Sequence, residues 1–359
     1  MKEFNYYQPT DIKFGQGRVG EIGQIVSEWG KRCLLVTVPI FPDFEGLIRK
    51  VKQSLEESGI AVAHFDEVIP NPTTEVVSDG TRMARSHNAD VVIGLGGGSS
   101  MDTAKAIAVE ATHEGTCWDY LFFRDTQPTE KTLPVITITT TSGTGSQVTQ
   151  VAVVTNPAEK NKSALYHPLI FPKVSIVDPE LMVTVPKHIT ASTGFDVFAH
   201  AFESYLNLNG SPYTDLMSVE AIRLVAAHLP QAVKNGEDKE ARTLMAWADT
   251  LAGLSIANAG VTLPHGIGMA IGGNYPHVKH GEALAVVYPA ILRYTYRAAP
   301  GKFARVTNLF NPSMKNLPDE EAAARFCSIM EDFLKEIGMS FCFEDLKVPK
   351  EELRALAEA

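Results

Sequence analysis

An aspartate and a histidine stand four residues apart in the segment GFDVFAHAFESY, residues 194–205. The segment is rich in alanine and phenylalanine and contains no proline, so it is predicted to be helical. The spacing then places Asp196 and His200 on one face of the helix, where a carboxylate oxygen and an imidazole nitrogen can bind the same divalent cation. A surface ion pair is the commoner explanation of such a pair, so the metal hypothesis depends on further ligands.

The segment LPHGIGMAIGGNYPHVKHGEA, residues 263–283, supplies three further histidines. His265 follows Pro264 at the expected start of a helix, and His280 precedes Gly281, which allows a close approach of the backbone. His277 lies three residues before His280 and is an alternative ligand. One aspartate and three histidines suit Fe²⁺ or Zn²⁺. The remaining histidines are scattered and are predicted to be structural or solvent-facing: His64, His87, His113, His167, His188 and His228.

Two glycine-rich turns in the first half of the chain are candidates for nucleotide binding. GLGGGSSMD, residues 94–102, lies between a predicted strand and a predicted helix, so its backbone amides can approach a phosphate. Ser99 and Asp102 are predicted to form a capping box for that helix. The ordinary Rossmann fingerprint follows the first strand, whereas this turn lies near residue 95. A second turn, TTTSGTGSQ at 139–147, offers hydroxyls and amides to a pyrophosphate or a ribose.

Residues 1–183 are predicted to form an α/β domain with a mostly parallel sheet. Apolar, β-branched runs such as RCLLVTV (32–38) and LPVITITTT (133–141) are typical of buried strands, and VAVVTN and KVSIVD are predicted to be further strands. Helical segments alternate with these strands, which indicates βαβ units. After VDPE every long segment shows helical periodicity, so residues 184–359 are predicted to form an all-α domain.

Composition excludes several classes of protein. A net charge of −10 over 359 residues argues against a nucleic-acid-binding protein, which usually has a basic face. The four cysteines are far apart and form no C-x-x-C motif, so neither a disulfide framework nor a thiolate zinc site is indicated. The N-terminus has no apolar signal region and no apolar stretch reaches about 18 residues. We therefore expect a reduced, soluble, cytoplasmic protein that does not enter a membrane.

The ordered set of motifs resembles the iron-containing (group III) alcohol dehydrogenase family, within the dehydroquinate synthase-like superfamily. The similar segments cover nearly the whole chain: PT-x-I-x-FG at 9–15, PNPT, GGGSSMD, TTTSGTGS, IVDPEL, GFDVFAHAFESY, HGIGMAIGG, and HG at 280–281. The resemblance implies an N-terminal dinucleotide-binding α/β domain and an all-helical C-terminal domain, with the active site in the cleft between them. It implies four metal ligands, for Fe²⁺ ahead of Zn²⁺: Asp196, His200, His265 and His280. It also places eight residues near NAD or NADP: Asn71, Gly97, Gly98, Ser99, Thr140, Thr141, Thr149 and Lys162.

The activity that the resemblance implies is reversible hydride transfer between a small alcohol or aldehyde and a nicotinamide, in a homodimer or larger homo-oligomer. The cation would bind the alcohol oxygen and, in the reverse direction, polarise the carbonyl. A glycerol dehydrogenase-like enzyme and a metal-free maleylacetate reductase-like enzyme are alternatives, although all four ligand positions are filled, which disfavours the second. A non-catalytic nucleotide-binding homologue is the alternative of another class.

The sequence departs from the family pattern at several places. Val38 stands where an acidic residue usually contacts the cofactor ribose, so we expect NADP to be used at least comparably to NAD. Met269 and Gln147 replace a common histidine and the usual glutamate. The segment between His265 and His280 is one residue longer than is typical, which keeps His277 as a rival ligand. The chain ends at LRALAEA, earlier than relatives usually do, so shortened terminal helices are expected.

Overall fold

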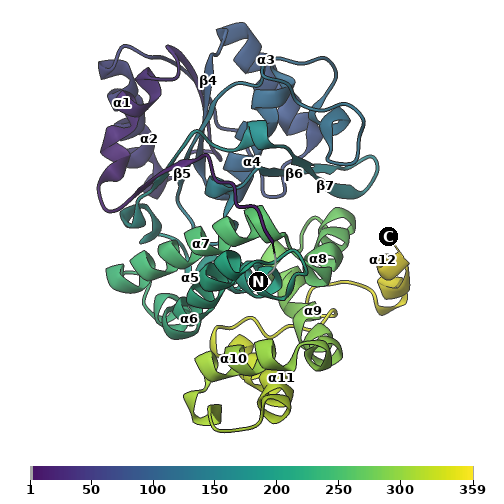
Figure 1. Ribbon diagram of the computed structural model, residues 1–359. Helices are drawn as coiled ribbons and strands as arrows, with labels where there is room; N and C mark the ends of the chain where they lie inside the picture. Colours follow the sequence, from purple (N-terminus) through teal and green to yellow (C-terminus); the bar gives the residue numbers. More distant parts are fainter. Residues whose placement is uncertain (1–2, 359) are drawn as a thin grey trace. The chain divides into compact units, whose positions relative to one another are not determined.

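The apolar runs of the first half form a six-stranded parallel sheet in the computed structural model, which describes residues 3–358 (Figure 1). The strand order is β1-β8-β5-β4-β2-β3, and each pairing between neighbours is parallel. The strands are β1 (Asp11–Phe14), β2 (Arg32–Val36), β3 (Ala61–Phe65), β4 (Val91–Gly96), β5 (Val135–Thr139) and β8 (Val174–Val177). The prediction of a parallel α/β domain is therefore confirmed.

Helices cover both faces of this sheet because successive side chains of a strand point to opposite sides. In β2, Cys33 and Leu35 share a core cluster with residues of α1 (Ile22–Ser27) and α2 (Pro42–Glu57). Leu34 and Val36 belong to a second cluster with residues of α3 (Thr74–His87) and α4 (Gly98–Glu110). Figure 1 shows α1 and α2 on one side of β4 and α3 and α4 on the other.

The strand order reverses between β2 and β4. After β2 the chain forms the edge strand β3, and it then crosses to β4 on the opposite side of β2. In open α/β sheets, ligands bind beyond the carboxyl ends of the strands at such a switch point. The residues that follow these two strands are Thr37 and Val38 after β2, and Gly97 and Gly98 after β4.

One predicted strand does not join the parallel sheet. β6 (Val151–Asn156) pairs antiparallel with β7 (Asn161–Tyr166), which the sequence analysis missed. The connection spans only residues 157–160, and Lys160 adopts a positive φ of 48°. A connection this short joins antiparallel strands, whereas parallel strands need a long crossover.

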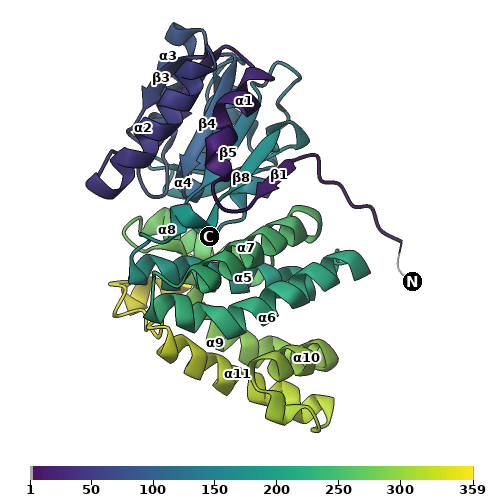
Figure 2. The same cartoon turned by 90° about the vertical axis from the view of Figure 1, so that its left-hand side faces the viewer.

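The second half of the chain is helical, as predicted, and its described residues from 185 onward form no strand. The helices are α5 (Lys187–Leu206), α6 (Pro212–Lys234), α7 (Lys239–Ala259), α8 (Leu263–Asn274), α9 (His280–Thr295), α10 (Pro300–Phe310), α11 (Asp319–Glu336) and α12 (Leu353–Glu358). Short 3₁₀ turns, η1 to η8, connect elements along the chain; the one used below is η3 (Ser146–Val148). Figure 2 shows α5, α6 and α7 side by side.

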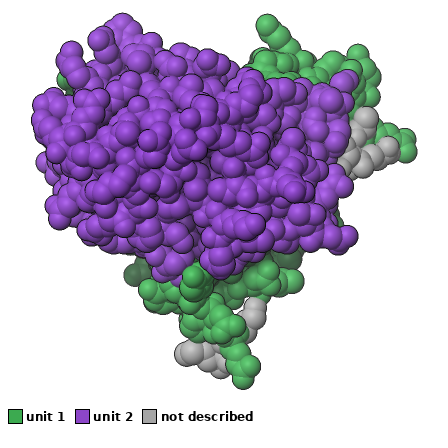
Figure 3. Space-filling view, turned by 90° about the horizontal axis from the view of Figure 1, so that it is seen from above, with its two compact units in different colours: residues 1–7, 142–144, 185–359 green, residues 8–141, 145–184 purple. Residues whose placement is uncertain are grey.

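The chain divides into two compact units, coloured separately in Figure 3. One unit comprises Gln8–Thr141 and Gly145–Thr184, and it contains the parallel sheet. The other comprises the residues from Val185 onward, the described N-terminal residues up to Tyr7, and the short segment Ser142–Thr144. The second glycine-rich turn therefore contributes residues to both units.

Within the described residues, no single helix is both long and apolar enough to cross a bilayer. Helices α7 and α8 pass that test only as a pair, and they are bent by 99° at the break between them.

Candidate metal centre

Helix α5 carries three polar side chains along one buried face. Asp196, His200 and Glu203 follow the spacing of one face of an α-helix and are 3%, 6% and 1% exposed. An adjacent stripe of phenylalanines holds this face in place: Phe198 and Phe202 stack with ring centroids 5.3 Å apart and contact aromatic rings of other helices. The aromatic core of the helical unit thus fixes where the polar face points.

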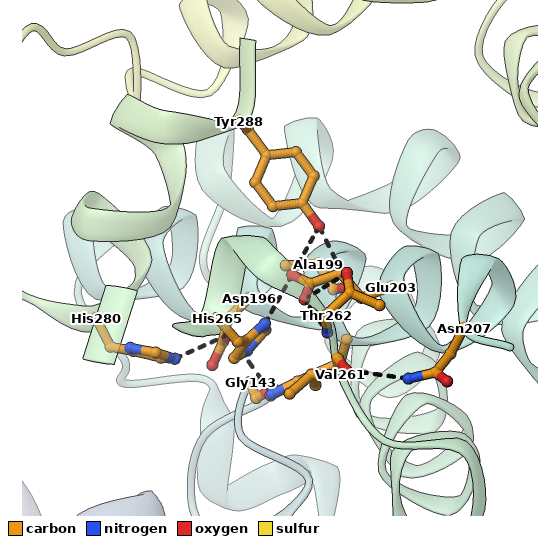
Figure 4. Close-up of polar contacts among 11 residues, drawn as sticks. Gly143, Asp196, Ala199, Glu203, Asn207, Val261, Thr262, His265, His280 and Tyr288 are labelled. Atoms are coloured by element: carbon orange, nitrogen blue, oxygen red, sulfur yellow. Dashed lines mark hydrogen bonds and ion pairs between the residues drawn. The ribbon is translucent and has the colours of Figure 1, made fainter. Parts of the chain in front are cut away.

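The four predicted ligands converge on one oxygen atom. Oδ1 of Asp196 lies 3.5 Å from Nε2 of His265 and 3.7 Å from Nε2 of His280 (Figure 4). The same oxygen lies 3.8 Å from Nε2 of His200. Tetrahedral ligands about 2.1 Å from a shared cation lie about 3.4 Å from one another. Asp196, His265 and His280 also meet as a group of donor atoms within 4.8 Å of one another. The structure therefore brings Asp196, His265 and His280 together at separations close to those that a divalent cation requires, whereas His200 is placed beside them by its 3.8 Å separation from Asp196.

Two atoms of this cluster have no hydrogen-bond partner in the described chain. Asp196 Oδ1 and His265 Nε2 are buried, and neither makes a hydrogen bond there. A buried polar atom without a hydrogen bond is costly, and a bound cation would remove that cost. The residues present therefore fit a divalent metal ion.

The electrostatics of the cluster also favour positive charge. Burial would raise the pKa of the Asp196 carboxyl, but the imidazoles of His200, His280 and His265 outweigh it and lower that pKa. Burial would lower the pKa of His265, but the carboxylates of Glu203 and Asp196 outweigh it and raise that pKa to about 10. The carboxylates of Glu203 and Asp196 would likewise attract a cation beside His265.

His280 reaches the cluster because a glycine follows it. A Cβ atom on Gly281 would lie 2.2 Å from the carbonyl oxygen of Ser192 in α5. Only glycine therefore lets the first turn of α9 approach α5 so closely, and the predicted role of Gly281 in close backbone approach is confirmed. His265 comes from the first turn of α8, after the N-cap residue Thr262.

His277 is not part of the cluster. Its side chain is exposed, and its Nε2 lies 3.0 Å from the carbonyl oxygen of Leu346, to which it donates a hydrogen bond. Its ring also packs edge-on against Tyr275. His277, the alternative ligand, therefore bonds the C-terminal segment instead of joining the other proposed ligands.

Sequence reasoning missed the residues that hold the ligands in place. His265 Nδ1 donates to Glu203 Oε1 at 2.7 Å, and His200 Nδ1 donates to the carbonyl oxygen of Gly143 at 3.1 Å. Such partners fix the orientation of a metal-binding imidazole. Glu203 carried a signal, because it stands seven residues after Asp196 on the same face. Gly143 carried none: its role depends on packing against Thr193, whose Cβ would lie 2.6 Å from a Cβ at position 143.

The two glycine-rich turns meet in the α/β unit. The backbone amide of Thr140 donates to the carbonyl oxygen of Gly96 at 2.9 Å, and a Cβ on Gly97 would lie 3.3 Å from Thr141 Oγ1. Gly98 and Ser99 form the first turn of α4 beside them. The structure therefore places these predicted cofactor residues together at the carboxyl ends of β4 and β5.

The other predicted cofactor residues lie on neighbouring segments. Lys162 of β7 donates to Asn71 Oδ1 at 2.8 Å, and Asn71 adopts a positive φ of 54°. Thr149 follows η3, and its carbonyl oxygen accepts a hydrogen bond from the buried Lys105 Nζ at 2.9 Å. The same ammonium group bonds Ser146, so Lys105 ties the second glycine-rich turn to α4.

The predicted capping box is wrong. The N-cap residue of α4 is Gly97, in an extended conformation and without a side-chain cap. Asp102 instead accepts hydrogen bonds from Ser146 Oγ at 2.6 Å and from the Val153 amide at 3.1 Å. These partners lie on later segments of the chain, and they compete with the local cap that the S-x-x-D pattern suggests.

Comparison with known proteins decides the family. Residues 9–179 match the family model described as "Iron-containing alcohol dehydrogenase". Residues 190–359 match the model described as "Fe-containing alcohol dehydrogenase family, C-terminal". The chain belongs to the iron-containing alcohol dehydrogenase family.

Relatives match along almost the full length of this alcohol dehydrogenase. It is 40% identical over 353 residues to a choline dehydrogenase of Bacillus subtilis, covering 97% of this chain and 85% of the relative. It is 36% identical to an NAD-dependent methanol dehydrogenase of Bacillus methanolicus, covering 99% and 92%. An archaeal halo-thermophilic alcohol dehydrogenase from a Red Sea brine pool superposes with a TM-score of 0.95 at 36% identity, covering 100% and 92%. The chain is an iron-type alcohol dehydrogenase, an oxidoreductase that acts on CH–OH groups, as the resemblance implied.

The resemblance marks three positions, Val38, Met269 and Gln147, as departures from the family pattern. Val38 is half-buried after β2, at the switch point of the sheet. Met269 is half-buried on α8, one turn after His265. Gln147 is buried in η3, within the second glycine-rich turn.

Proposed function

We propose that this alcohol dehydrogenase catalyses reversible hydride transfer between a small alcohol and the nicotinamide of NAD or NADP. Asp196, His200, His265 and His280 hold the divalent cation, Fe²⁺ ahead of Zn²⁺. The observation that carries the proposal is the convergence of three imidazole nitrogens on the buried Asp196 Oδ1. The relatives named for choline and methanol support a small hydroxyl compound as substrate.

A bound cation would supply Lewis-acid activation of the substrate oxygen, and a bound nicotinamide would take up the hydride. In alcohol oxidation the carbon would give up that hydride and the hydroxyl would release its proton to solvent, which leaves the carbonyl product. The chain contributes the geometry of the site. His200 and His265 are held by Gly143 and Glu203, and the carboxylates of Asp196 and Glu203 offset the charge of a dication.

The α/β half supplies the dinucleotide site. Helix α4 begins at Gly98, directly after the N-cap residue Gly97, and the N-terminus of a helix suits an anionic pyrophosphate. Seven of the eight predicted cofactor residues lie on this turn, on the second glycine-rich turn or in the Asn71–Lys162 pair, and Thr149 follows η3. We assign residues 1–183 to dinucleotide binding and residues 184–359 to metal and substrate binding. The division into two compact units supports this assignment, except that the N-terminal residues up to Tyr7 and the segment Ser142–Thr144 belong to the helical unit and Thr184 belongs to the α/β unit.

The cysteines bear on the cellular compartment of the enzyme, and its family bears on the oligomeric state. All four cysteines are free, including the exposed Cys342, which supports a reducing compartment such as the cytoplasm. We propose a homodimer or a larger homo-oligomer. Size-exclusion chromatography with light scattering tests that proposal.

The test of the function is turnover with a panel of short alcohols and aldehydes. The purified protein is loaded with Fe²⁺ or Zn²⁺ and assayed with NAD and NADP through nicotinamide absorbance. We expect turnover with at least one metal and its loss on chelation or in Asp196→Asn. Full activity of Asp196→Asn after chelation would refute the metal site.

The cofactor turn has a separate test. Gly97→Val places a side chain against Thr141, so we expect weaker NAD(H) binding by calorimetry with unchanged metal content. Gly46→Val is the control, because an added Cβ on this exposed glycine of α2 meets no atom within 4 Å. Equal NAD(H) affinity in both variants would make the turn at Gly97 merely structural.

A further inference from the structure

Glu203 is a buried carboxylate surrounded by hydrogen-bond donors. Its Oε1 accepts from His265 Nδ1 at 2.7 Å and from the Tyr288 hydroxyl at 3.1 Å (Figure 4). Its Oε2 accepts from the Thr262 amide at 2.7 Å and from the Thr262 hydroxyl at 3.2 Å. The side chain is 1% exposed, so these groups take the place of water around its charge.

These contacts join the three helices that carry the proposed ligands. Glu203 lies on α5, with Asp196 and His200. Thr262 is the N-cap residue of α8, and Tyr288 belongs to α9, the helix that begins at His280. The Thr262 amide is at the N-terminus of α8, where a negative charge is stabilised by the helix dipole. One carboxylate therefore anchors the helix that presents His265 and contacts the helix that presents His280.

The hydrogen bond to Glu203 decides which nitrogen of His265 is free. A carboxylate can only accept, so Nδ1 carries a proton, and in the neutral ring that binds a metal the lone pair is then on Nε2. That Nε2 is the atom 3.5 Å from Asp196 Oδ1, and it makes no hydrogen bond within the described chain. We propose that Glu203 is the positioning residue of the metal centre: it fixes the tautomer and ring orientation of His265 and adds a second negative charge beside the cation. This inference rests on the metal site proposed above.

Glu203→Gln separates this role from simple space filling. The amide has nearly the same shape, but its NH₂ group cannot accept a hydrogen bond. If NH₂ faces His265, the ring must accept, and its proton moves to Nε2 and blocks the ligand atom. If NH₂ faces Thr262 instead, two donors oppose each other and the charge is still lost. Both orientations weaken metal binding.

The experiment measures Co²⁺ and Zn²⁺ affinity by competition with a chelator, together with the visible absorption of bound Co²⁺. We expect Glu203→Gln to bind about 10- to 100-fold more weakly than the parent and to change the Co²⁺ spectrum. Tyr288→Phe keeps the bond to His265 and should stay within about 3-fold of the parent. Glu110→Gln is the matched control, since it removes another buried carboxylate, which bonds Ser78 and the Cys117 amide in the α/β unit. That variant should keep the parent's metal affinity.

A second measurement uses only the parent protein, so it does not depend on whether a variant folds. In the Zn²⁺-loaded parent, nitrogen-15 NMR should show the His265 proton on Nδ1, with Nε2 as the metal-bound atom. A proton on Nε2, or Glu203→Gln with the parent's affinity and Co²⁺ spectrum, overturns the role of Glu203. Failure of the metal site itself would look different: the parent and Asp196→Asn would bind Co²⁺ equally.

Discussion

Asp196 is buried at the centre of three imidazoles that come from three different helices. A charge in this position is costly unless other groups compensate it, and removing one partner of a buried charged group is usually destabilising. Its Oδ1 nevertheless makes no hydrogen bond within the described chain. At the scale of single residues, this combination is better explained by a cation site than by a stabilising ion pair.

The first prediction separates the two rival histidines. His280→Ala should lower metal affinity by more than about 100-fold, because it removes a donor from the cluster itself. His277→Ala should leave metal affinity unchanged, because that side chain bonds Leu346 instead. Metal content after dialysis against a weak chelator measures both variants. Loss of metal from His277→Ala alone would reverse the assignment.

The second prediction concerns cofactor preference at position 38. Val38 follows β2 at the switch point, where an aspartate would accept bonds from the ribose and repel the 2′-phosphate of NADP. We expect NADPH to be used at least comparably to NADH by the parent. Val38→Asp should shift the preference toward NADH by about 1–3 kcal/mol, the range for a charged hydrogen bond. The measurement is kcat/KM for both reduced cofactors with one aldehyde.

Two results would contradict this second prediction. The parent could already be strongly selective for NADH, or the ratio could stay the same in Val38→Asp. Arg49→Ala is an informative companion variant, because Arg49 lies on α2, the helix that follows this strand. A selective loss of NADPH activity in that variant would indicate that its guanidinium binds the phosphate.

At the scale of elements, the metal centre depends on how closely α9 approaches α5. Gly281→Ala would put a Cβ 2.2 Å from the Ser192 carbonyl oxygen, so the first turn of α9 must move and carry His280 with it. We expect metal affinity to fall by about 10-fold or more, with the helical content unchanged. Chelator competition and far-UV circular dichroism provide the two measurements.

Gly266 is the matched control for this third prediction. It is exposed and adjacent to His265, and an added Cβ there meets no atom within 4 Å. Gly266→Ala should keep the metal and stabilise α8 by about 0.5–1 kcal/mol, because alanine is the better helix former. Equal metal affinity in Gly281→Ala and Gly266→Ala would show that the close approach of α9 is not needed.

At the scale of the whole molecule, the two units have separate hydrophobic cores and separate proposed ligands. Core clusters cover the two faces of the sheet in one unit, and Ile271, Ala283 and Val287 help to form another cluster in the helical unit. A ligand that binds only the folded state stabilises the segments that form its site. Metal and dinucleotide should therefore protect different parts of the chain.

The fourth prediction tests this separation by hydrogen–deuterium exchange. Metal at about 100 times its Kd stabilises the binding state by about 2.7 kcal/mol. Amides that exchange only when local unfolding disrupts the metal site should therefore exchange about 100-fold more slowly. We expect protection in α5 and in the first turns of α8 and α9, and little change in α2. NADH should instead protect residues 96–101, 139–141 and 145–149. Equal protection of α2 and α5 by metal would contradict the assignment of the ligands to separate units.

Much of this protein could be predicted from local sequence patterns. Periodicity separates the α/β half from the helical half because it reports which side of a strand or helix is buried. The spacing of Asp196 and His200 placed both on one face of α5, and glycine after His280 signalled a close backbone approach. These features depend only on residues that are near one another in the chain.

Other features were decided by tertiary contacts. His265 bonds Glu203 across 62 positions of the sequence, and His200 bonds Gly143 across 57. The choice between His277 and His280 depends on packing of α9 against Ser192 and on the hydrogen bond to Leu346. Asp102 likewise bonds Ser146 and Val153 instead of capping its own helix, because distant donors satisfy a buried carboxylate better than a local turn does. A local pattern shows which side chains share a face, but only the folded chain shows which donors and acceptors they meet there.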